Sequence, residues 1–215
     1  MTSETTLDAL FAGRVRELWP GKPPSAIAKD PVRAARVEVT GLLGDAQADL
    51  RVHGGPAKAI HVYPARHYAW WISELGSNPR FVPGGFGENI SLGDWDEHGV
   101  CIGDIWRVGS AVVQVSQGRQ PCWKLAAHVG EDRMAELVRS TLRTGWYLRV
   151  LDEGEIGVGD TIVRVERLHP EVTVARVAKA VFDKKTAAEE CATLARVPEL
   201  DDAWAAILGR RAAMA

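Results

Sequence analysis

The chain has 215 residues, of which 46% are hydrophobic and 25% charged, so it is long enough and apolar enough to bury a substantial core. Its formal net charge of -2 argues against a general nucleic-acid or membrane-surface binder, because such proteins carry a basic excess. The three scattered cysteines, and the lack of both a signal-peptide pattern and an apolar run of about 18 residues, predict a cytoplasmic protein without a disulfide framework.

Short stretches rich in β-branched and aromatic residues alternate with glycine, proline and aspartate turns through most of the chain. This spacing is typical of a β-barrel or a β-sandwich. Two segments, Ala65–Leu75 and Asp132–Leu142, instead have apolar residues at helical intervals, which predicts helices inserted into a β core. The predicted strands cover residues 37–40, 60–63, 105–108, 111–115 and 161–165.

The pattern changes near residue 170, where alanine-rich segments with helical spacing replace the strands. Three short helices are predicted, at Thr173–Phe182, Ala187–Ala195 and Leu200–Arg211, each opening with a capping residue or an acidic first turn. We therefore expect a mainly β domain with helical insertions over residues 1–168. A small three-helix domain is expected over residues 169–215.

The first polar cluster runs from His53 to His61 and contains Gly54, Gly55 and Lys58. Adjacent glycines allow backbone N–H groups to approach a ligand closely, and the neighbouring lysine favours an anion. The same residues are also typical of a plain glycine turn between strands with a solvated lysine. The spacing matches neither a Walker motif nor a dinucleotide-binding fingerprint.

Two further clusters follow along the chain. Gly84–Ile90 is rich in glycine, among them Gly87, and includes Glu88 and Asn89, whose side chains can recognise donors and acceptors on a polar ligand. Arg143, directly after the second predicted helix, is of the type that grips a phosphate with two N–H groups. An ordinary helix-ending turn would have the same sequence.

Cys122 ends an apolar, strand-like segment and is the most informative single residue. Its neighbours Arg119 and Lys124 favour the thiolate, which is the form that attacks electrophiles and binds soft metals. A lone cysteine is also compatible with a small buried apolar side chain. A thiol hydrolase with His61 or His128 as its base is a further interpretation, whereas zinc is not expected because no C-x₂-C or H-x₃-H pair occurs.

Six motifs give these residues a common context. In order and approximate spacing they resemble the MOSC domain family, specifically its YiiM-like branch, over about residues 13–165. The segment after Pro170 is similar to the three-helix extension of that branch, and the resemblance implies a MOSC-type β-barrel core. The motifs are Gly21–Lys29, Gly41–Asp49, His53–Pro56, Phe86–Asn89, Ile102–Asp104 and Val115–Leu125.

The resemblance also implies a function. A MOSC protein of this branch is expected to bind the molybdenum cofactor (molybdopterin), with Cys122 as the molybdenum ligand. It is expected to be a molybdenum-dependent reductase of N-hydroxylated compounds, such as hydroxylaminopurines and amidoximes, with Cys122 in catalysis and His53 or His61 handing over a proton. The expected cofactor-binding residues are Ser25, His53, Gly54, Gly55, Lys58, Gly87, Glu88, Asn89, Gln117, Arg119, Lys124 and Arg143.

The expected partners are a small N-hydroxylated substrate and a separate flavin or ferredoxin-type reductase. The sequence has no flavin or haem fingerprint, and three cysteines cannot supply the four thiolates of an iron-sulfur cluster. No nucleic-acid or membrane partner is expected, and a homodimer is compatible with the sequence. The alternative to a reductase is a carrier of sulfur or of the cofactor, with a persulfide on Cys122 and no turnover. Gly118 stands where this family has a proline, which predicts a looser loop before Arg119.

Overall fold

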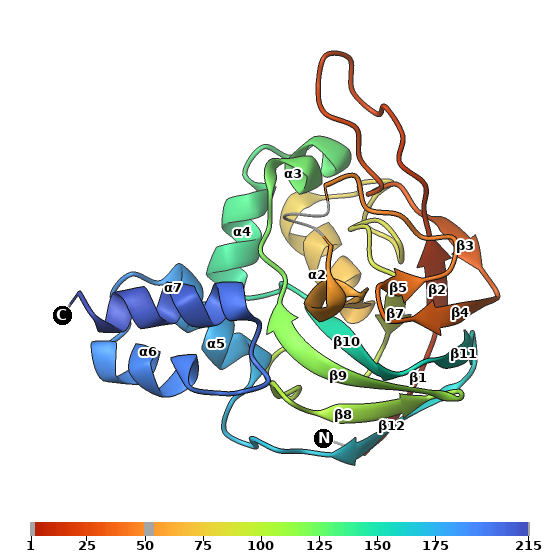
Figure 1. Cartoon of the computed structure of the whole chain (residues 1–215). Helices are drawn as coiled ribbons and strands as arrows, with labels where there is room; N and C mark the ends of the chain where they lie inside the picture. Colours follow the sequence, from red (N-terminus) through yellow and green to blue (C-terminus); the bar gives the residue numbers. More distant parts are fainter. Residues whose placement is uncertain (1–2, 50–53, 215) are drawn as a thin grey trace.

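The computed structural model describes residues 3–49 and 54–214, and a curled nine-stranded sheet forms its centre (Figure 1). In spatial order its strands are β1 (Glu4–Thr6), β12 (Thr161–Glu166), β8 (Ile105–Val108), β9 (Ala111–Gly118), β10 (Trp146–Asp152), β6 (Ile60–Pro64), β7 (Ile90–Leu92), β2 (Ala9–Ala12) and β3 (Asp30–Val32). Neighbouring strands are antiparallel, except that β6 and β7 run parallel. A smaller sheet consists of β11 (Gly154–Gly157), β4 (Ala34–Glu38) and β5 (Gly41–Leu42).

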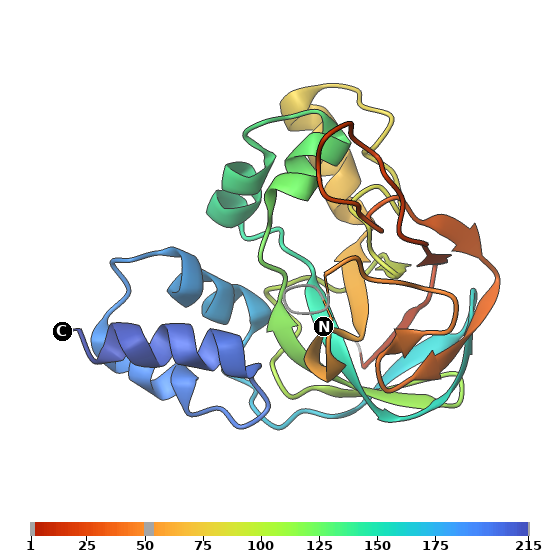
Figure 2. The same ribbon diagram turned by 45° about the horizontal axis from the view of Figure 1, so that its top comes forward.

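The helices form two groups on the curled sheet (Figures 1 and 2). The first group consists of α2 (Arg66–Leu75), α3 (Trp123–Val129) and α4 (Met134–Thr141). The second consists of α5 (Val174–Phe182), α6 (Ala188–Ala195) and α7 (Asp202–Ala212), which lie together beside β9. A short 3-10 helix, η1 (Pro56–Lys58), precedes β6. Within the described residues, no helix combines the length and the apolar character needed to cross a bilayer.

Two apolar clusters attach these groups to the sheet. The first joins both sheets to the C-terminal helices and contains a row of Trp95, Trp106 and Trp146, whose rings meet edge to face with centroids 4.9 and 6.0 Å apart. The second joins β6 to the first helix group around the buried side chains of Tyr63 and Trp71. The two groups of helices therefore bury their apolar faces in different cores.

The mainly β architecture predicted from the sequence is confirmed. The five predicted strands correspond to β4, β6, β8, β9 and β12, and the five predicted helices correspond to α2, α4, α5, α6 and α7. The boundaries differ by a few residues, and β9 continues past the predicted end to Gly118. Alternation of apolar residues and helical spacing therefore identified the longer elements correctly.

Two missed elements change the surroundings of Cys122. Strand β10, a central strand between β9 and β6, was not predicted, although it is rich in large β-forming residues. Helix α3 has seven residues, too few for a helical period to stand out, and ends at Gly130 with a φ of 77°. The expectation that Cys122 ends a strand is therefore wrong: β9 stops at Gly118, and Cys122 is the N-cap residue of α3.

The C-terminal helices share their apolar core with the sheet. The N–H of Ile102 donates to the carbonyl of Val172 at 2.8 Å, and the N–H of Asp201 donates to the carbonyl of Ser116 on β9 at 3.0 Å. The packing is continuous across the boundary that the sequence predicts between residues 168 and 169. That division into two domains stays a prediction.

Candidate functional site

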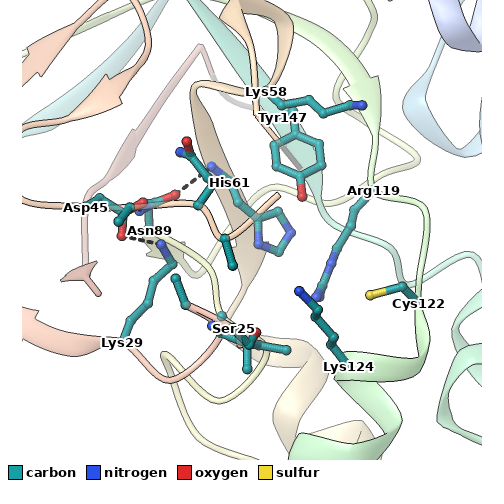
Figure 3. Close-up of a pocket in the computed structure, with 16 residues that line it drawn as sticks. Ser25, Lys29, Asp45, Lys58, His61, Asn89, Arg119, Cys122, Lys124 and Tyr147 are labelled. Atoms are coloured by element: carbon teal, nitrogen blue, oxygen red, sulfur yellow. Dashed lines mark hydrogen bonds and ion pairs between the residues drawn. The ribbon is translucent and has the colours of Figure 1, made fainter. Parts of the chain in front are cut away.

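A pocket lies where β6, β10 and the segment after β9 meet the loop between β2 and β3 (Figure 3). It holds about 570 Å³ of space, part of it open to solvent. Loops and strand ends far apart in the sequence contribute its walls. The lining residues are Ser25, Ala26, Ile27, Lys29, Asp45, Ala46, Gln47, Ala48, Lys58, His61, Gly87, Asn89, Arg119, Cys122, Lys124 and Tyr147.

Cys122 is half-buried, and its Sγ points into the pocket (Figure 3). The backbone around it is held on both sides. The carbonyl of Pro121 accepts a hydrogen bond from Nη2 of Arg139 at 3.3 Å, and the carbonyl of Cys122 accepts one from the N–H of Leu125 at 3.1 Å. The thiol is therefore presented to the pocket from a fixed corner between a strand and a helix.

Arg119 and Lys124 line the same pocket from either side of the thiol (Figure 3), as the sequence predicted, and are only 7% and 9% exposed. Lys124 donates from Nζ to the carbonyl of Pro24 at 3.1 Å, and the backbone N–H of Arg119 donates to the carbonyl of Gly145 at 3.1 Å. No carboxylate in the described part of the chain forms an ion pair with either side chain. Burying a cation without a counter-charge is costly, so this pair favours an anionic ligand.

The formal charge of the pocket is strongly positive. Four lining side chains are cationic and one is a carboxylate, namely Lys29, Lys58, Arg119, Lys124 and Asp45. Asp45 forms an ion pair with Lys29, and their side chains are only 2% and 7% exposed. Burial lowers the pKa of Lys29, and the Asp45 charge opposes this shift. The carboxylate of Asp45 is thus paired with Lys29, and no other carboxylate among the described lining residues balances the charges of Arg119 and Lys124.

Asn89 connects the walls of the pocket. Its Oδ1 accepts from the backbone N–H of His61 at 3.0 Å, and its Nδ2 donates to the carbonyl of Phe11 at 3.2 Å and to Oδ2 of Asp45 at 2.9 Å. Both N–H donors of the amide are therefore used within the fold, and only acceptor capacity is left for a ligand. Asn89 lies in the pocket as expected, but its contacts are those of a residue that positions β6 and the loop of Asp45.

His61 lies at the back of the pocket and is 4% exposed. Its Nε2 has no hydrogen-bond partner among the described residues, and its ring centroid lies 5.0 Å from that of Tyr147. Burial lowers the pKa of His61 well below 6.5, and the charge of Arg119 acts in the same direction. At neutral pH the ring is therefore a neutral imidazole with a spare hydrogen-bonding atom, which does not suit the expected role of handing over a proton.

Tyr147 was not predicted as a site residue. Its hydroxyl points into the pocket toward Arg119 (Figure 3). Burial raises the pKa of Tyr147, so the phenol is neutral at physiological pH. Lys29, Asp45 and Gln47 were also missed, although the family motifs Gly21–Lys29 and Gly41–Asp49 contained them. A search within those motifs for charged and amide side chains would have found them.

The loop between β2 and β3 enters the pocket through Ser25 and Ile27. Ser25 is 3% exposed, and its Oγ accepts from the N–H of Ile27 at 3.2 Å. Gly87 faces this loop with a φ of 76°, and a Cβ there would lie 2.7 Å from Cγ1 of Ile27. Gly87 is thus needed for the close approach of the two segments that form this wall.

Glu88 does not line the pocket. It is fully buried, and its carboxylate accepts hydrogen bonds from the hydroxyl of Tyr68 at 2.7 Å and from Oγ of Ser91 at 2.9 Å. The backbone N–H groups of Gly84 and Phe86 also donate to it, at 2.6 and 3.1 Å. This carboxylate, expected at the cofactor, instead holds its own glycine-rich loop together.

Two other expected cofactor ligands lie outside the pocket lining. The guanidinium carbon of Arg143 is 3.8 Å from the ring centroid of Trp70, a cation–π contact. Gln117 on β9 is 1% exposed, and its Oε1 has no partner among the described residues. Neither side chain lines the pocket that contains Cys122.

Only part of the glycine cluster before β6 lines the pocket. Lys58, at the end of η1, lines the pocket, whereas Gly54 and Gly55 precede it and do not. His53 lies outside the described residues. Ser116 on β9 fixes η1, because its Oγ lies 2.5 Å from the carbonyl of the residue before Lys58.

His128, the second candidate base of a thiol hydrolase, does not line the pocket. Burial, followed by the positive charges of Arg80 and Arg119, lowers its pKa to about 4. The Nε2 atom of His61 has no hydrogen-bond partner among the described residues. The thiol-hydrolase interpretation stays a prediction.

Comparison with known proteins gives a domain match and three informative relatives. The MOSC domain matches residues 49–163. Protein YiiM of Escherichia coli (strain K12) is 34% identical over 204 residues, covering 94% of this chain and 90% of that protein. The uncharacterized protein YflK of Bacillus subtilis (strain 168) is 47% identical over 131 residues, which cover 61% of this chain and 58% of that protein.

A fungal relative, named a reductase, comes from Gibberella moniliformis (strain M3125 / FGSC 7600) and is 34% identical over 197 residues. The alignment covers 88% of this chain but 34% of the fungal protein, so the chain spans about a third of that relative. Among solved structures, that of YiiM from Geobacillus stearothermophilus superposes with a TM-score of 0.82 at 30% identity and covers 97% of this chain and 99% of that one. The likeness therefore extends over both the sheet and the C-terminal helices.

Proposed function

Because the chain belongs to the MOSC domain family, we propose that it binds the molybdenum cofactor in the pocket around Cys122 and reduces N-hydroxylated small molecules. In this proposal Cys122 is the protein ligand to molybdenum. The name of the fungal relative supports oxidoreductase activity, although that name applies to a protein about three times as long as the match.

One observation carries the proposal: a half-buried thiol shares a pocket with two buried cations that have no carboxylate partner in the described chain. A thiolate is a soft ligand and suits a metal centre that is already coordinated by sulfur. Molybdopterin carries a phosphate, for which Arg119 and Lys124 supply charge and hydrogen-bond donors. The donor set in the pocket therefore fits both ends of this cofactor.

The other lining residues fit supporting roles. His61 offers its unpartnered Nε2, and Tyr147 offers its hydroxyl, as hydrogen-bonding groups for the polar pterin. Asn89 and Asp45 hold β6 and the neighbouring loop in place. When bound, the cofactor supplies a redox-active metal centre suited to removing oxygen from nitrogen. The low pKa of His61 leaves the proton supply to solvent entering the open side of the pocket.

Reduction of a hydroxylamine to an amine, or of an amidoxime to an amidine, consumes two electrons and two protons and releases water. The proposal therefore includes a separate flavin or ferredoxin-type reductase as electron donor. A cytoplasmic location, the lack of nucleic-acid and membrane partners, and self-association as a homodimer remain predictions.

The test uses protein made in a host that synthesises the molybdenum cofactor. We expect stoichiometric molybdenum by elemental analysis, and reduction of benzamidoxime or 6-hydroxylaminopurine with reduced viologen as electron donor. The Cys122→Ser variant should lose both. Cys101→Ser is the matched control, because Cys101 is buried away from the pocket and donates to the carbonyl of Pro170, a bond that serine can also make.

Other results would point to the other functions. A persulfide on Cys122 in mass spectra, with no turnover by the molybdenum-loaded protein, would favour a carrier of sulfur or cofactor. Hydrolase activity that alkylation of Cys122 blocks, without any need for molybdenum, would favour a thiol hydrolase. Retention of both molybdenum and reductase activity in Cys122→Ser would refute the proposal.

A further inference from the structure

Gly118, the last residue of β9, packs directly against Trp204 of α7. A Cβ at residue 118 would lie 2.8 Å from Cη2 and 3.3 Å from Cζ3 of the indole, and the first of these distances is shorter than real Cβ contacts. Gly118 is not among the glycines with positive φ, so a side chain there would meet no backbone strain. Space for the indole is therefore what requires glycine at this position.

The indole is held in place from its own side. Trp204 is 2% exposed and packs edge to face on Phe182 of α5, with ring centroids 5.9 Å apart. Asp201 caps α7 by accepting from the N–H of Trp204 at 3.3 Å, and its own N–H donates to the carbonyl of Ser116 on β9 at 3.0 Å. An added methyl group at Gly118 would therefore force a shift of the backbone at the end of β9 or of the indole.

The next residue along the chain is Arg119, which carries unbalanced charge into the pocket. Successive residues of an extended segment point to opposite sides. Trp204 thus supports the back of the segment whose front presents Arg119. The carbonyl of Gly145, which accepts from the N–H of Arg119 at 3.1 Å, is the other support of this segment. The sequence predicted that Gly118 loosens this loop, whereas the structure packs an aromatic ring against it.

We propose that Trp204 is a positioning residue of the pocket, which acts by packing against Gly118 and so fixes the backbone from which Arg119 reaches a bound anion. The C-terminal helices then belong to the binding site, although none of their residues lines it. The inference rests on the proposed function only for the identity of the anion, the phosphate of the cofactor. The packing of Trp204 on Gly118 does not depend on it.

The experiment combines Gly118→Ala and Trp204→Phe in a double-mutant cycle on cofactor-free protein, with inorganic phosphate as the probe in calorimetric titrations. Gly118→Ala should weaken phosphate binding about tenfold, because small misplacements of a binding group are costly. Phenylalanine lacks the outer ring that meets residue 118, so the double variant should recover to within about threefold of wild type. Gly209→Ala, in α7 with open space around it, is the matched control and should not change binding.

Hydrogen exchange of the peptide over residues 117–122 supplies a readout that needs no ligand. It should quicken in Gly118→Ala and return to the wild-type rate in the double variant. Unchanged phosphate affinity and exchange in a folded Gly118→Ala protein, or failure of Trp204→Phe to rescue them, would overturn the inference. If wild-type protein binds neither phosphate nor cofactor while exchange follows the expected pattern, the proposed function fails and the positioning contact stands.

Discussion

Two neighbouring regions differ in the partners that they provide for buried charged side chains. The carboxylate of Glu88, fully buried beside the pocket, accepts hydrogen bonds from four donors that belong to its own loop, to α2 and to β7. The side chains of Arg119 and Lys124, almost as deeply buried, form no ion pair with a described carboxylate. The charge of Glu88 is thus matched by donors within the fold, whereas the charges of Arg119 and Lys124 have no counter-ion among the described residues.

This difference separates charges that stabilise the fold from charges that bind a ligand. A buried ion is tolerated when the fold supplies enough hydrogen bonds or an opposite charge, and it is costly otherwise. Asp104 and Arg167 belong to the first kind, because two hydrogen bonds of 2.6 and 2.8 Å join them. The cations beside Cys122 have no ion pair with a carboxylate among the described residues, so a bound anion would offset part of the cost of burying them.

The largest effect is expected for Glu88→Ala. Four donors would lose their acceptor, which should lower the free energy of unfolding by about 4 kcal/mol. Urea denaturation measures this change. Glu74→Ala, on the exposed part of α2, is the control and should stay within about 0.5 kcal/mol of wild type. A loss at Glu88 as small as that of the control would show that its hydrogen bonds do not hold the loop.

Asp45→Asn tests the ion pair between Asp45 and Lys29 in the pocket. Lys29 would lose its counter-charge at a site where both side chains are buried, so stability should fall by about 3 kcal/mol. Phosphate should at the same time bind more tightly, because the pocket loses the negative charge of Asp45. Asp30→Asn makes the same change in an exposed pair with Arg16 and should alter neither quantity. Weaker phosphate binding in Asp45→Asn would contradict this account.

Arg119→Gln should change stability and phosphate binding in the directions opposite to those expected for Asp45→Asn. Removing an unbalanced buried cation should leave stability unchanged or raise it, while phosphate binding weakens about tenfold, or about 1.4 kcal/mol. Arg143→Gln is the matched control, since that guanidinium packs on Trp70 outside the pocket. Calorimetric titration with phosphate distinguishes the two variants. Equal losses in both would restore the sequence-based assignment of Arg143 to the cofactor site.

The smallest effect concerns pH. Burial holds the pKa of His61 well below 6.5 and that of His128 near 4, so on acidification the unfolded chain takes up these protons first. The associated stability is complete above pH 6.5 and is lost as pH falls below it, by at most about 1.4 kcal/mol per pH unit for each histidine. Urea midpoints between pH 7.5 and 5 should therefore fall less steeply in His61→Gln. An identical slope would mean that His61 protonates in the folded protein.

The sequence predicted more of the fold than of the site. Helical spacing located α2 and α5 within a few residues, and alternation located β6 and β8, because such patterns reflect which face of an element is buried. The short helix α3 has too few residues to show a period, so the corner that presents Cys122 was not predicted. The central strand β10, which brings Tyr147 into the pocket, was not predicted from the sequence.

The sequence alone identified the family, through six ordered motifs. It also singled out the thiol between Arg119 and Lys124, because both signals are local in the chain. Packing decided which distant side chains meet there. Asn89 and its neighbour Glu88 show why: adjacent residues of one motif face opposite ways, the first into the pocket and the second into its own loop. Side-chain direction depends on backbone angles and tertiary contacts, which spacing in a motif does not determine.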